Sequence, residues 1–305
     1  MTILFTALSP IFALIFIGYG FKRIGFPSDN FWPSVDRLTY YALVPALLVH
    51  KLATAKIDDS LNAFAMVEIV LVMLAVLSLL LMLWQKFLPF DAPVYTSVYQ
   101  GAIRFNTYVF LALVDNLYGD KGIVLAAFLI TFAIPFINVL CVSTFGFYIN
   151  EGKFSFGKLW LSIIKNPLII ACMLGGFLNF GGVGLPFGVA PIIKMFGSPA
   201  IPLGLLSIGV GLRFKSLGTF KADFWIASVA KLVILPLLGF GGCFILGVDG
   251  LMRDVVILFC AMPTAVSAYI LAREMGGDAG LMATLITGQT LLAIATLSGV
   301  MAWLL

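Results

Sequence analysis

Long apolar runs alternate with short polar breaks along the whole chain, and this pattern predicts membrane-spanning helices. Such a helix needs about 20 mainly apolar residues. Ten segments qualify: 2–21, 32–52, 62–85, 93–116, 121–149, 159–180, 189–212, 221–246, 251–272 and 279–304. The breaks carry turn and charge signals, such as Lys22-Arg23 and Gly276-Gly277-Asp278. The sequence therefore predicts an all-α membrane protein with ten transmembrane helices and no domain outside the bilayer.

Composition agrees with lipid as the main solvent. Of the 305 residues, 62% are hydrophobic and 10% are charged, whereas soluble domains contain about 25% charged residues. Cys141, Cys172, Cys243 and Cys260 fall inside apolar runs, and His50 is the only histidine. Their spacing indicates neither a metal site nor a disulfide framework, so we expect no cofactor and no nucleic-acid partner. The N-terminal segment is interpreted as the first span and not as a cleaved signal.

Lys and Arg are distributed unevenly between the two sets of breaks, nine against four. The richer set is Lys22, Arg23, Lys86, Lys153, Lys158, Arg213, Lys215, Lys221 and Arg273, and the poorer set is Lys51, Lys56, Lys121 and Arg253. Because cytoplasmic loops carry the excess of basic residues, the richer set is predicted to be cytoplasmic. Both termini then lie outside.

An internal repeat is visible at an offset of 157 residues. The matched pairs are Pro10 with Pro167, Gly18 with Gly175, Gly25 with Gly182, Pro45 with Pro202, Thr107 with Thr264, and Gly119 with Gly276. The two repeats are 1–150 and 158–305, with five spans each. An odd number of spans inserts the second repeat with the opposite orientation, as in many alternating-access carriers.

Two spans are interrupted at matching depths. The fourth has Arg104, Asn106 and Thr107 near its middle, and the ninth has Pro263 and Thr264. Proline breaks a helix interior, while Asn and Thr favour helix caps. Both sites are therefore predicted to start a half-helix, with Pro263 in its first position. The free N–H groups of such a start favour an anionic ligand.

Each of these interpretations has an alternative. Pro263 could be an ordinary kink of a membrane helix. Arg104 needs a partner inside the membrane, either a substrate carboxylate that fits its guanidinium or an internal acid such as Glu68.

Other ionisable residues within the spans are further candidates. Glu68 and His50 are the candidates for ion coupling or for a supporting site, with interfacial roles as the alternative. Lys231 is another functional candidate. The alternatives are that its side chain snorkels to the membrane interface or that it forms a structural ion pair. The neighbouring Asp36 and Arg37 are either functional or a helix-end pair.

Three stretches resemble the auxin efflux carrier family, which is related to the bile acid sodium symporters. The resemblance is to a bacterial-type member of the family. They are DRLTYYALVPALLVHKLA at 36–53, NPLIIACMLGGFLNF at 166–180 and AMPTAVSAYILAREMGGDAGLMATLI at 261–286. The resemblance covers essentially the whole chain, and the last stretch is the most specific.

This resemblance implies a scaffold of helices 1, 2, 6 and 7 and a moving transport bundle of helices 3–5 and 8–10. Helices 4 and 9 are broken where they cross, and substrate binds beside that crossing, here Asn106-Thr107 and Met262-Pro263-Thr264. His50 matches a histidine on the support side of the site in plant members. Two departures matter: Asn106 replaces a crossing proline, and the long cytoplasmic loop is absent. They suggest a bacterial inner-membrane protein for small dicarboxylates rather than auxin.

The leading hypothesis is therefore a secondary transporter that moves small organic anions by alternating access. The coupling ion is a proton or sodium, and the sequence does not decide between them. It also does not decide whether the protein is a homodimer. A sodium-coupled symporter of the bile acid type is the alternative, although Gln100, Asn106 and Gln289 are a small supply of amides for sodium. Broken helices also line channels. An enzyme is disfavoured because HExxH, GxSxG and GxGD are absent from the sequence.

Overall fold

Helices make up nearly all of the computed structural model, which describes residues 2–28, 30–55, 63–149, 157, 161, 164–186, 188–217 and 220–304. Within these residues there is no strand. The first half contains α1 (Thr2–Arg23), α2 (Phe31–Leu38), η1 (Thr39–Leu43), α3 (Val44–Ala53), α4 (Ala63–Phe87), α5 (Ala92–Ile103) and α6 (Thr107–Tyr148). The second contains α8 (Pro167–Phe180), α9 (Val189–Gly197), α10 (Ala200–Gly211), η2 (Phe214–Ser216), α11 (Ala222–Val229), η3 (Ala230–Ile234), α12 (Leu235–Leu246), α13 (Gly250–Ala261), α14 (Ser267–Met275) and α15 (Ala279–Leu304).

Every range predicted to span the membrane contains helix, so the all-helical class is confirmed. Five helical stretches among the described residues are long and apolar enough to cross a bilayer. The predicted fourth and fifth spans are joined through α6, which bends sharply at Gly119 (φ 57°, ψ −142°). Most of the predicted link at 150–158, and Lys56, lie outside the described residues.

Three interruptions were not predicted, and each is found next to proline. The π-helical turns η1 and η3 directly precede helices that carry Pro45 and Pro236 in their first turn. A proline ring clashes with the carbonyl four residues before it, and a wider π turn relieves that clash. The predicted seventh span is likewise divided at Ser198 and Pro199 into α9 and α10.

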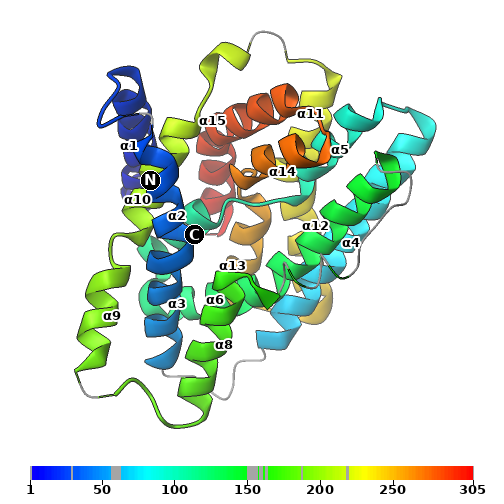
Figure 1. The fold of residues 1–305 in the computed structure, drawn as a ribbon. Coiled ribbons are helices and arrows are strands. Elements are labelled where there is room, and N and C mark those ends of the chain that lie inside the picture. The colour runs from blue at the N-terminus through cyan, green and yellow to red at the C-terminus, as the bar shows by residue number, and fades with distance from the viewer. Residues whose placement is uncertain are drawn as a thin grey trace.

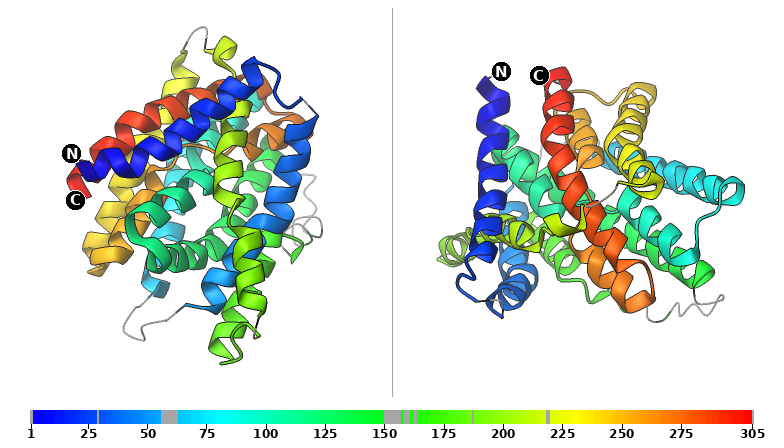
Figure 2. Two further views of the ribbon diagram at one scale, coloured as in Figure 1. Left: turned by 90° about the vertical axis from the view of Figure 1, so that its left-hand side faces the viewer. Right: turned by 90° about the horizontal axis from the view of Figure 1, so that it is seen from above.

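The helices pack in two groups. Helix α1 packs along α10, and α3 packs along α8 and α9. Helices α4, α5 and α11 to α15 contact one another, and α6 contacts members of both groups. Figure 1 shows α1, α3, α9 and α10 on the left and α4, α5, α11 and α12 on the right. In Figure 2, α1 runs beside α15 and the two chain termini lie close together.

Two glycines that correspond at the 157-residue offset allow close helix contacts in the first group. A Cβ on Gly18 of α1 would lie 2.0 Å from the carbonyl oxygen of Leu206 on α10. A Cβ on Gly175 of α8 would lie 3.2 Å from Cα of Val49 on α3. Leu206 and Val49 are themselves 157 positions apart, so one contact is the counterpart of the other.

Two further glycine pairs with this offset share a positive φ. Gly25 and Gly182 have φ values of 69° and 66°, and Gly119 and Gly276 have values of 57° and 83°. Positive φ is accessible to glycine at little cost and is unfavourable for other residues. The turns at Gly119 and Gly276 nevertheless differ, because their ψ values are −142° and 22°.

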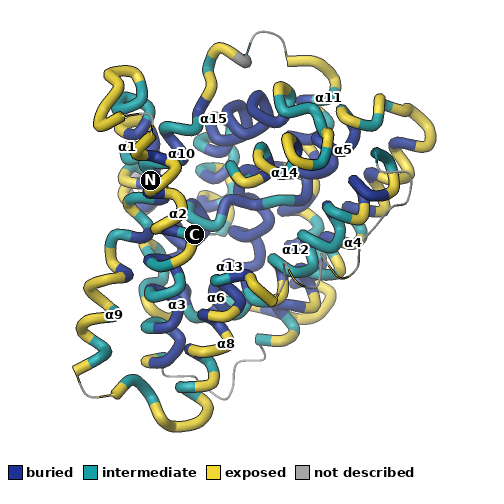
Figure 3. Tube along the Cα trace, viewed as in Figure 1, coloured by how far each residue is buried: buried dark blue, intermediate teal, exposed yellow. Residues whose placement is uncertain are grey.

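The most buried elements lie at the centre of the molecule. Residues Tyr95–Ile103 of α5 and Asp254–Ala261 of α13 are all buried, and Figure 3 shows α13 as part of the dark interior. Large apolar side chains such as Leu79, Trp84 and Phe244 are exposed on the outer helices. In a bilayer those side chains face lipid, and polar backbone breaks are tolerated only inside the protein.

Candidate functional site: the crossing of two broken helices

The first break lies between α5 and α6. Arg104 is extended (φ −70°, ψ 151°), and Asn106 is also non-helical (φ −87°, ψ 103°). The Asn106 side-chain oxygen accepts hydrogen bonds from the backbone N–H groups of Tyr108 (3.1 Å) and Val109 (3.3 Å). These are two of the donors that a helix start leaves without partners. The predicted half-helix therefore begins at Thr107 with Asn106 as its cap.

The second break is longer than predicted. Helix α13 ends at Ala261, Met262 is extended (φ −66°, ψ 140°), and α14 begins only at Ser267. The prediction that Pro263 occupies the first turn of a half-helix is thus wrong by four residues. Pro263 and Thr264 lie outside both helices, and the backbone of each takes part in a tertiary hydrogen bond across the break.

Three buried hydrogen bonds fasten the two breaks together. The backbone N–H of Asn106 donates to the carbonyl oxygen of Pro263 at 2.8 Å. Gln289 on α15 accepts from the N–H of Thr264 at 3.1 Å and donates to the carbonyl oxygen of Gly101 at 3.1 Å. Because unpaired backbone groups are costly away from water, these bonds determine where the chain can leave the helix.

An aromatic cluster packs against the same crossing. The rings of Phe105 and Phe259 lie 4.3 Å apart, and Phe110 contacts both of them at 6.0 and 5.5 Å. Phe105 belongs to the first break, whereas Phe259 precedes the second. The cluster thus adds apolar packing to the hydrogen bonds that join the broken helices.

The guanidinium of Arg104 is next to the crossing and has no carboxylate partner among the described residues. One terminal nitrogen donates to the side-chain oxygen of Asn138 on α6 at 3.0 Å, and the buried Nε makes no hydrogen bond to a described residue. Glu68, the predicted structural partner, is exposed on α4 and is not paired with Arg104. Of the two alternatives for Arg104, the internal ion pair with Glu68 is therefore wrong.

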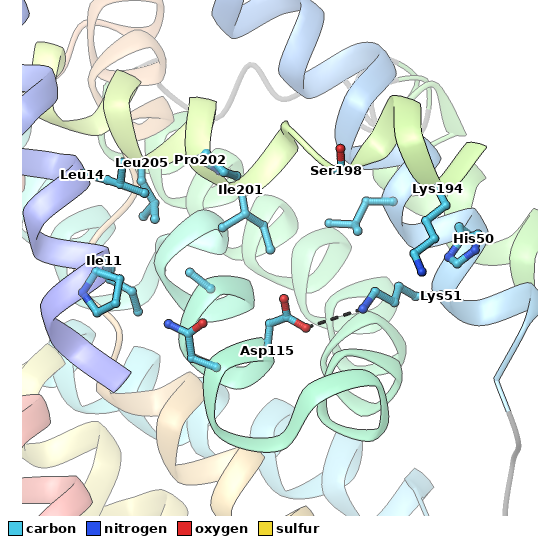
Figure 4. A pocket seen from close by; sticks show the side chains of 14 residues that line it. Ile11, Leu14, His50, Lys51, Asp115, Lys194, Ser198, Ile201, Pro202 and Leu205 are labelled. Carbon is cyan, nitrogen blue, oxygen red and sulfur yellow. Dashed lines mark ion pairs between the residues drawn. The ribbon is translucent and has the colours of Figure 1, made fainter. Parts of the chain in front are cut away.

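A cavity of about 360 Å³ lies between α1, α3, α9 and α10 on one side and α6 on the other. It is lined by His50, Lys51, Lys194, Asp115 and Asn116 together with apolar side chains (Figure 4). The cavity is therefore basic in character, with one carboxylate that Lys51 partly neutralises. His50, a predicted support residue, lies here and not at the crossing.

Lys51 connects α3 to α6 at this cavity. Its ammonium lies 3.5 Å from Asp115 and also pairs with Asp120 at the bend of α6. The hydrogen bond and charge of Lys51 hold the pKa of the Asp120 carboxyl below its usual range. Because Lys51 belongs to α3 and both acids belong to α6, these pairs tie the two helices together at one end.

Tyr108 lies between the cavity and the crossing along α6. A Cβ on Gly204 of α10 would lie 2.3 Å from a ring carbon of Tyr108, so the ring fills the space that a larger residue would need. Ala112, one turn further along α6, lines the cavity. The predicted site residues therefore form two places, the crossing (Arg104, Asn106, Thr107, Pro263, Thr264) and the cavity (His50), while Glu68 belongs to neither.

Some of the unpredicted site residues carry a signal in the sequence, but not all of them do. Asn138 is a polar residue inside an otherwise apolar span, which marks it as a candidate partner for Arg104. Lys51, Asp115 and Lys194 have the character of ordinary residues near span ends, because no local pattern shows that they share a cavity. No group of three or more His, Cys, Asp or Glu side chains within the described residues could hold a metal ion.

Comparison with known proteins agrees with a transporter. A family model described as "Membrane transport protein" matches residues 150–301. An uncharacterized transporter of Methanothermobacter thermautotrophicus is 26% identical over 293 residues, which cover 94% of each chain. A Rhizobium meliloti protein provisionally named a malonate transporter is 25% identical over 144 residues, covering 46% of this chain and 44% of its own. An uncharacterized transporter of Methanocaldococcus jannaschii is 26% identical over 188 residues, covering 59% of each chain.

The apolar helices and these matches define an integral membrane transporter. The match to the membrane transport protein model and the transporter relatives confirm the resemblance to the auxin efflux carrier family seen in the sequence.

Proposed function

We propose that this protein is a secondary active transporter that moves small organic anions, dicarboxylates such as malonate among them, across the bacterial inner membrane by alternating access. The observation that carries the proposal is Arg104. Its guanidinium is next to a helix break inside the protein and is not neutralised by any described carboxylate. An anionic substrate supplies the missing charge, and the guanidinium matches a carboxylate in geometry.

The proposed substrate site consists of Arg104, Asn106, Thr107, Pro263 and Thr264. Asn106 already caps two N–H groups of α6, so its role is to hold the break in shape. The Thr264 hydroxyl is buried and makes no hydrogen bond to a described residue, which leaves it available to a ligand. The name of the Rhizobium meliloti relative supports malonate as the first substrate to test.

The two helix groups support a mechanism of alternating access, in which one group moves against the other. We assign α1 to α3 and α8 to α10 to the scaffold, and α4 to α6 and α11 to α15 to the moving bundle. The glycine correspondences at the 157-residue offset support two inverted repeats, with both termini outside. In this arrangement the cavity beside His50, Lys51 and Lys194 is the path by which an anion approaches the crossing, drawn by its basic lining. The ion pairs of Lys51 with α6 then break and re-form as the bundle moves.

Uptake of labelled malonate by proteoliposomes tests the proposal, with Arg104→Gln compared with the parent and with Arg273→Gln. Arg273 is exposed on α14, so its variant controls for the loss of one positive charge. A desolvated charge-assisted hydrogen bond contributes about 1.5–3 kcal/mol, so Arg104→Gln is expected to weaken malonate binding by more than about tenfold.

Equal affinity in the parent and in a well-folded Arg104→Gln would place the substrate elsewhere. Flux that neither saturates nor shows exchange with malonate on the opposite side would indicate a channel instead.

A further inference from the structure

Lys231 is a fully buried cation on η3, behind the crossing. Its side chain has 0% exposure, and its ammonium makes no hydrogen bond to any described residue. The charged or titratable groups that influence it electrostatically are the thiols of Cys260 on α13 and Cys141 on α6. Lys231 therefore neither snorkels to an interface nor forms a described ion pair, and both structural alternatives for it are wrong.

The elements that contact η3 offer no free counter-charge. Their titratable residues are Asp223 on α11, Cys243 on α12, Arg253, Asp254 and Cys260 on α13, and Tyr95 and Tyr99 on α5, while α15 carries none. Asp254 is paired with Arg253 and accepts from Tyr118, and Asp223 lies two turns before Lys231 in the same helical segment. An ammonium in such surroundings costs several kcal/mol without a nearby anion, whereas the neutral amine does not.

On η3's neighbouring elements α5 and α11, other buried polar atoms also make no hydrogen bond to a described residue. They belong to Gln100 on α5, with both amide atoms, and to Ser228, one turn before Lys231. The backbone carbonyl of Gln100 accepts from the backbone N–H of Arg104 at 2.9 Å, so Gln100 is one helical turn before Arg104 in the chain. These unpaired side chains are an observation independent of Lys231 itself.

Helix contacts link Lys231 to the proposed substrate site. Its turn η3 contacts both α5, which ends at the Arg104 break, and α13, which ends at the second break. An anion held by Arg104 therefore binds at the end of a helix that contacts η3, and its negative charge favours the ammonium over the neutral amine.

We propose that Lys231, supported by Gln100 and Ser228, is the proton-binding residue of this transporter, and that the anion at Arg104 and a proton on the Lys231 amine bind together. This inference rests on the proposed function and names its coupling ion. The amine takes up one proton on the side where the anion enters and releases it where the anion leaves, so each anion is accompanied by one proton. Anion and proton affinities are then linked reciprocally. A sodium ion at the same place would be repelled by the ammonium, so a proton and not sodium is the coupling ion of this proposal.

Proton uptake on anion binding tests this inference directly. A pH-indicator dye reports protons in weakly buffered, detergent-solubilised protein while a panel of mono- and dicarboxylates, malonate included, is titrated in. At alkaline pH, where the free amine is neutral, the parent is expected to take up about one proton per bound anion, and its anion affinity is expected to fall by up to about tenfold per pH unit. Lys231→Met, of similar length but neutral, is expected to bind more weakly with no proton uptake and little pH dependence.

Lys86→Met is the matched control, because Lys86 is exposed at the end of α4, and it is expected to behave as the parent. Lys231→Gln replaces Lys231→Met if the latter does not fold, as judged by thermal unfolding. In proteoliposomes, an imposed pH gradient is expected to drive parent uptake with or without sodium.

The outcomes separate the two proposals. Anion binding by the parent without proton uptake, or undiminished proton uptake by either Lys231 variant, overturns the role of Lys231 alone. Uptake that follows a sodium gradient and ignores a pH gradient does the same. Failure of the parent to bind any carboxylate of the panel overturns both this inference and the proposed function on which it rests.

Discussion

Side-chain amides, and not charge pairs, hold the two broken helices in their crossed arrangement. Asn106 satisfies two N–H groups at the start of α6, and Gln289 joins the N–H of Thr264 to the carbonyl of Gly101. An amide suits this position because it donates and accepts at once without bringing a charge into the membrane interior. The non-helical position of Pro263 is thus consistent with these tertiary bonds as well as with its own ring.

Replacing Gln289 is predicted to destabilise the protein. In Gln289→Leu the N–H of Thr264 and the carbonyl of Gly101 both lose their partner, and each buried unpaired group costs about 1–3 kcal/mol. We expect a clearly lower midpoint in thermal unfolding of the detergent-solubilised protein. Thr290→Val is the control, because the buried Thr290 hydroxyl donates only to the carbonyl of Ile286 within its own helix. Equal midpoints for the two variants would show that the Gln289 bonds do not stabilise the crossing.

The residues of the site differ in how far a sequence can reveal them. Asn106 was identified as a cap because capping is local and depends on the residue type. The two partners of Gln289 are 25 and 188 positions away, so no pattern in its own helix predicts them. The pairing of Lys51 with Asp120 spans 69 positions and was hidden for the same reason. Glu68 is a candidate in the sequence only because it is a charged residue within a predicted span, and the sequence does not show that its side chain is exposed on α4.

At the scale of elements, apolar length predicted the helices well, and proline position explains most of the exceptions. The π turns before Pro45 and Pro236 keep those helices continuous where a simple kink would be expected. The start of α14 was misplaced because Pro263 suits a first turn locally, whereas its carbonyl is used by Asn106 from another helix.

Close helix contacts through glycine are predicted to be essential in both halves. In Gly18→Ala the new methyl would lie 2.0 Å from the Leu206 carbonyl oxygen, so α1 and α10 must separate. Gly175→Ala places a methyl 2.8 Å from Cβ of Leu52 and likewise pushes α8 from α3. Overpacking typically costs about 1–3 kcal/mol, and we expect both variants to unfold at lower temperature than the parent.

The same helices supply matched controls. Gly20 on α1 and Gly176 on α8 have no neighbouring atom within 4 Å of the place that a Cβ would occupy. Alanine there removes a flexible residue from a helix and is expected to raise stability by up to about 1 kcal/mol. If Gly18→Ala unfolds like Gly20→Ala, or Gly175→Ala like Gly176→Ala, the glycine contacts do not determine the packing of these helices.

At the scale of the whole molecule, the two halves share positive-φ glycines and helix contacts at a constant offset of 157 residues. Gly119, between two segments of α6, and Gly276, between α14 and α15, occupy equivalent positions. In the proposed arrangement, with five spans in each half, these two corners lie on opposite sides of the membrane. The uneven distribution of Lys and Arg predicts the Gly119 corner to be outside and the Gly276 corner to be cytoplasmic.

Cysteine labelling is predicted to show this inversion. Lys121→Cys and Arg273→Cys place a thiol beside the two corners, where both native side chains are exposed. A membrane-impermeant maleimide should label Lys121→Cys in intact cells, and should label Arg273→Cys only after the membrane is opened. The parent is the control for background, because its four cysteines are free and buried. Labelling of both variants from the same side would contradict the inverted repeat. Labelling of Arg273→Cys alone in intact cells would keep the repeat but reverse the orientation, and would place the cavity that contains His50 and Lys194 on the cytoplasmic face.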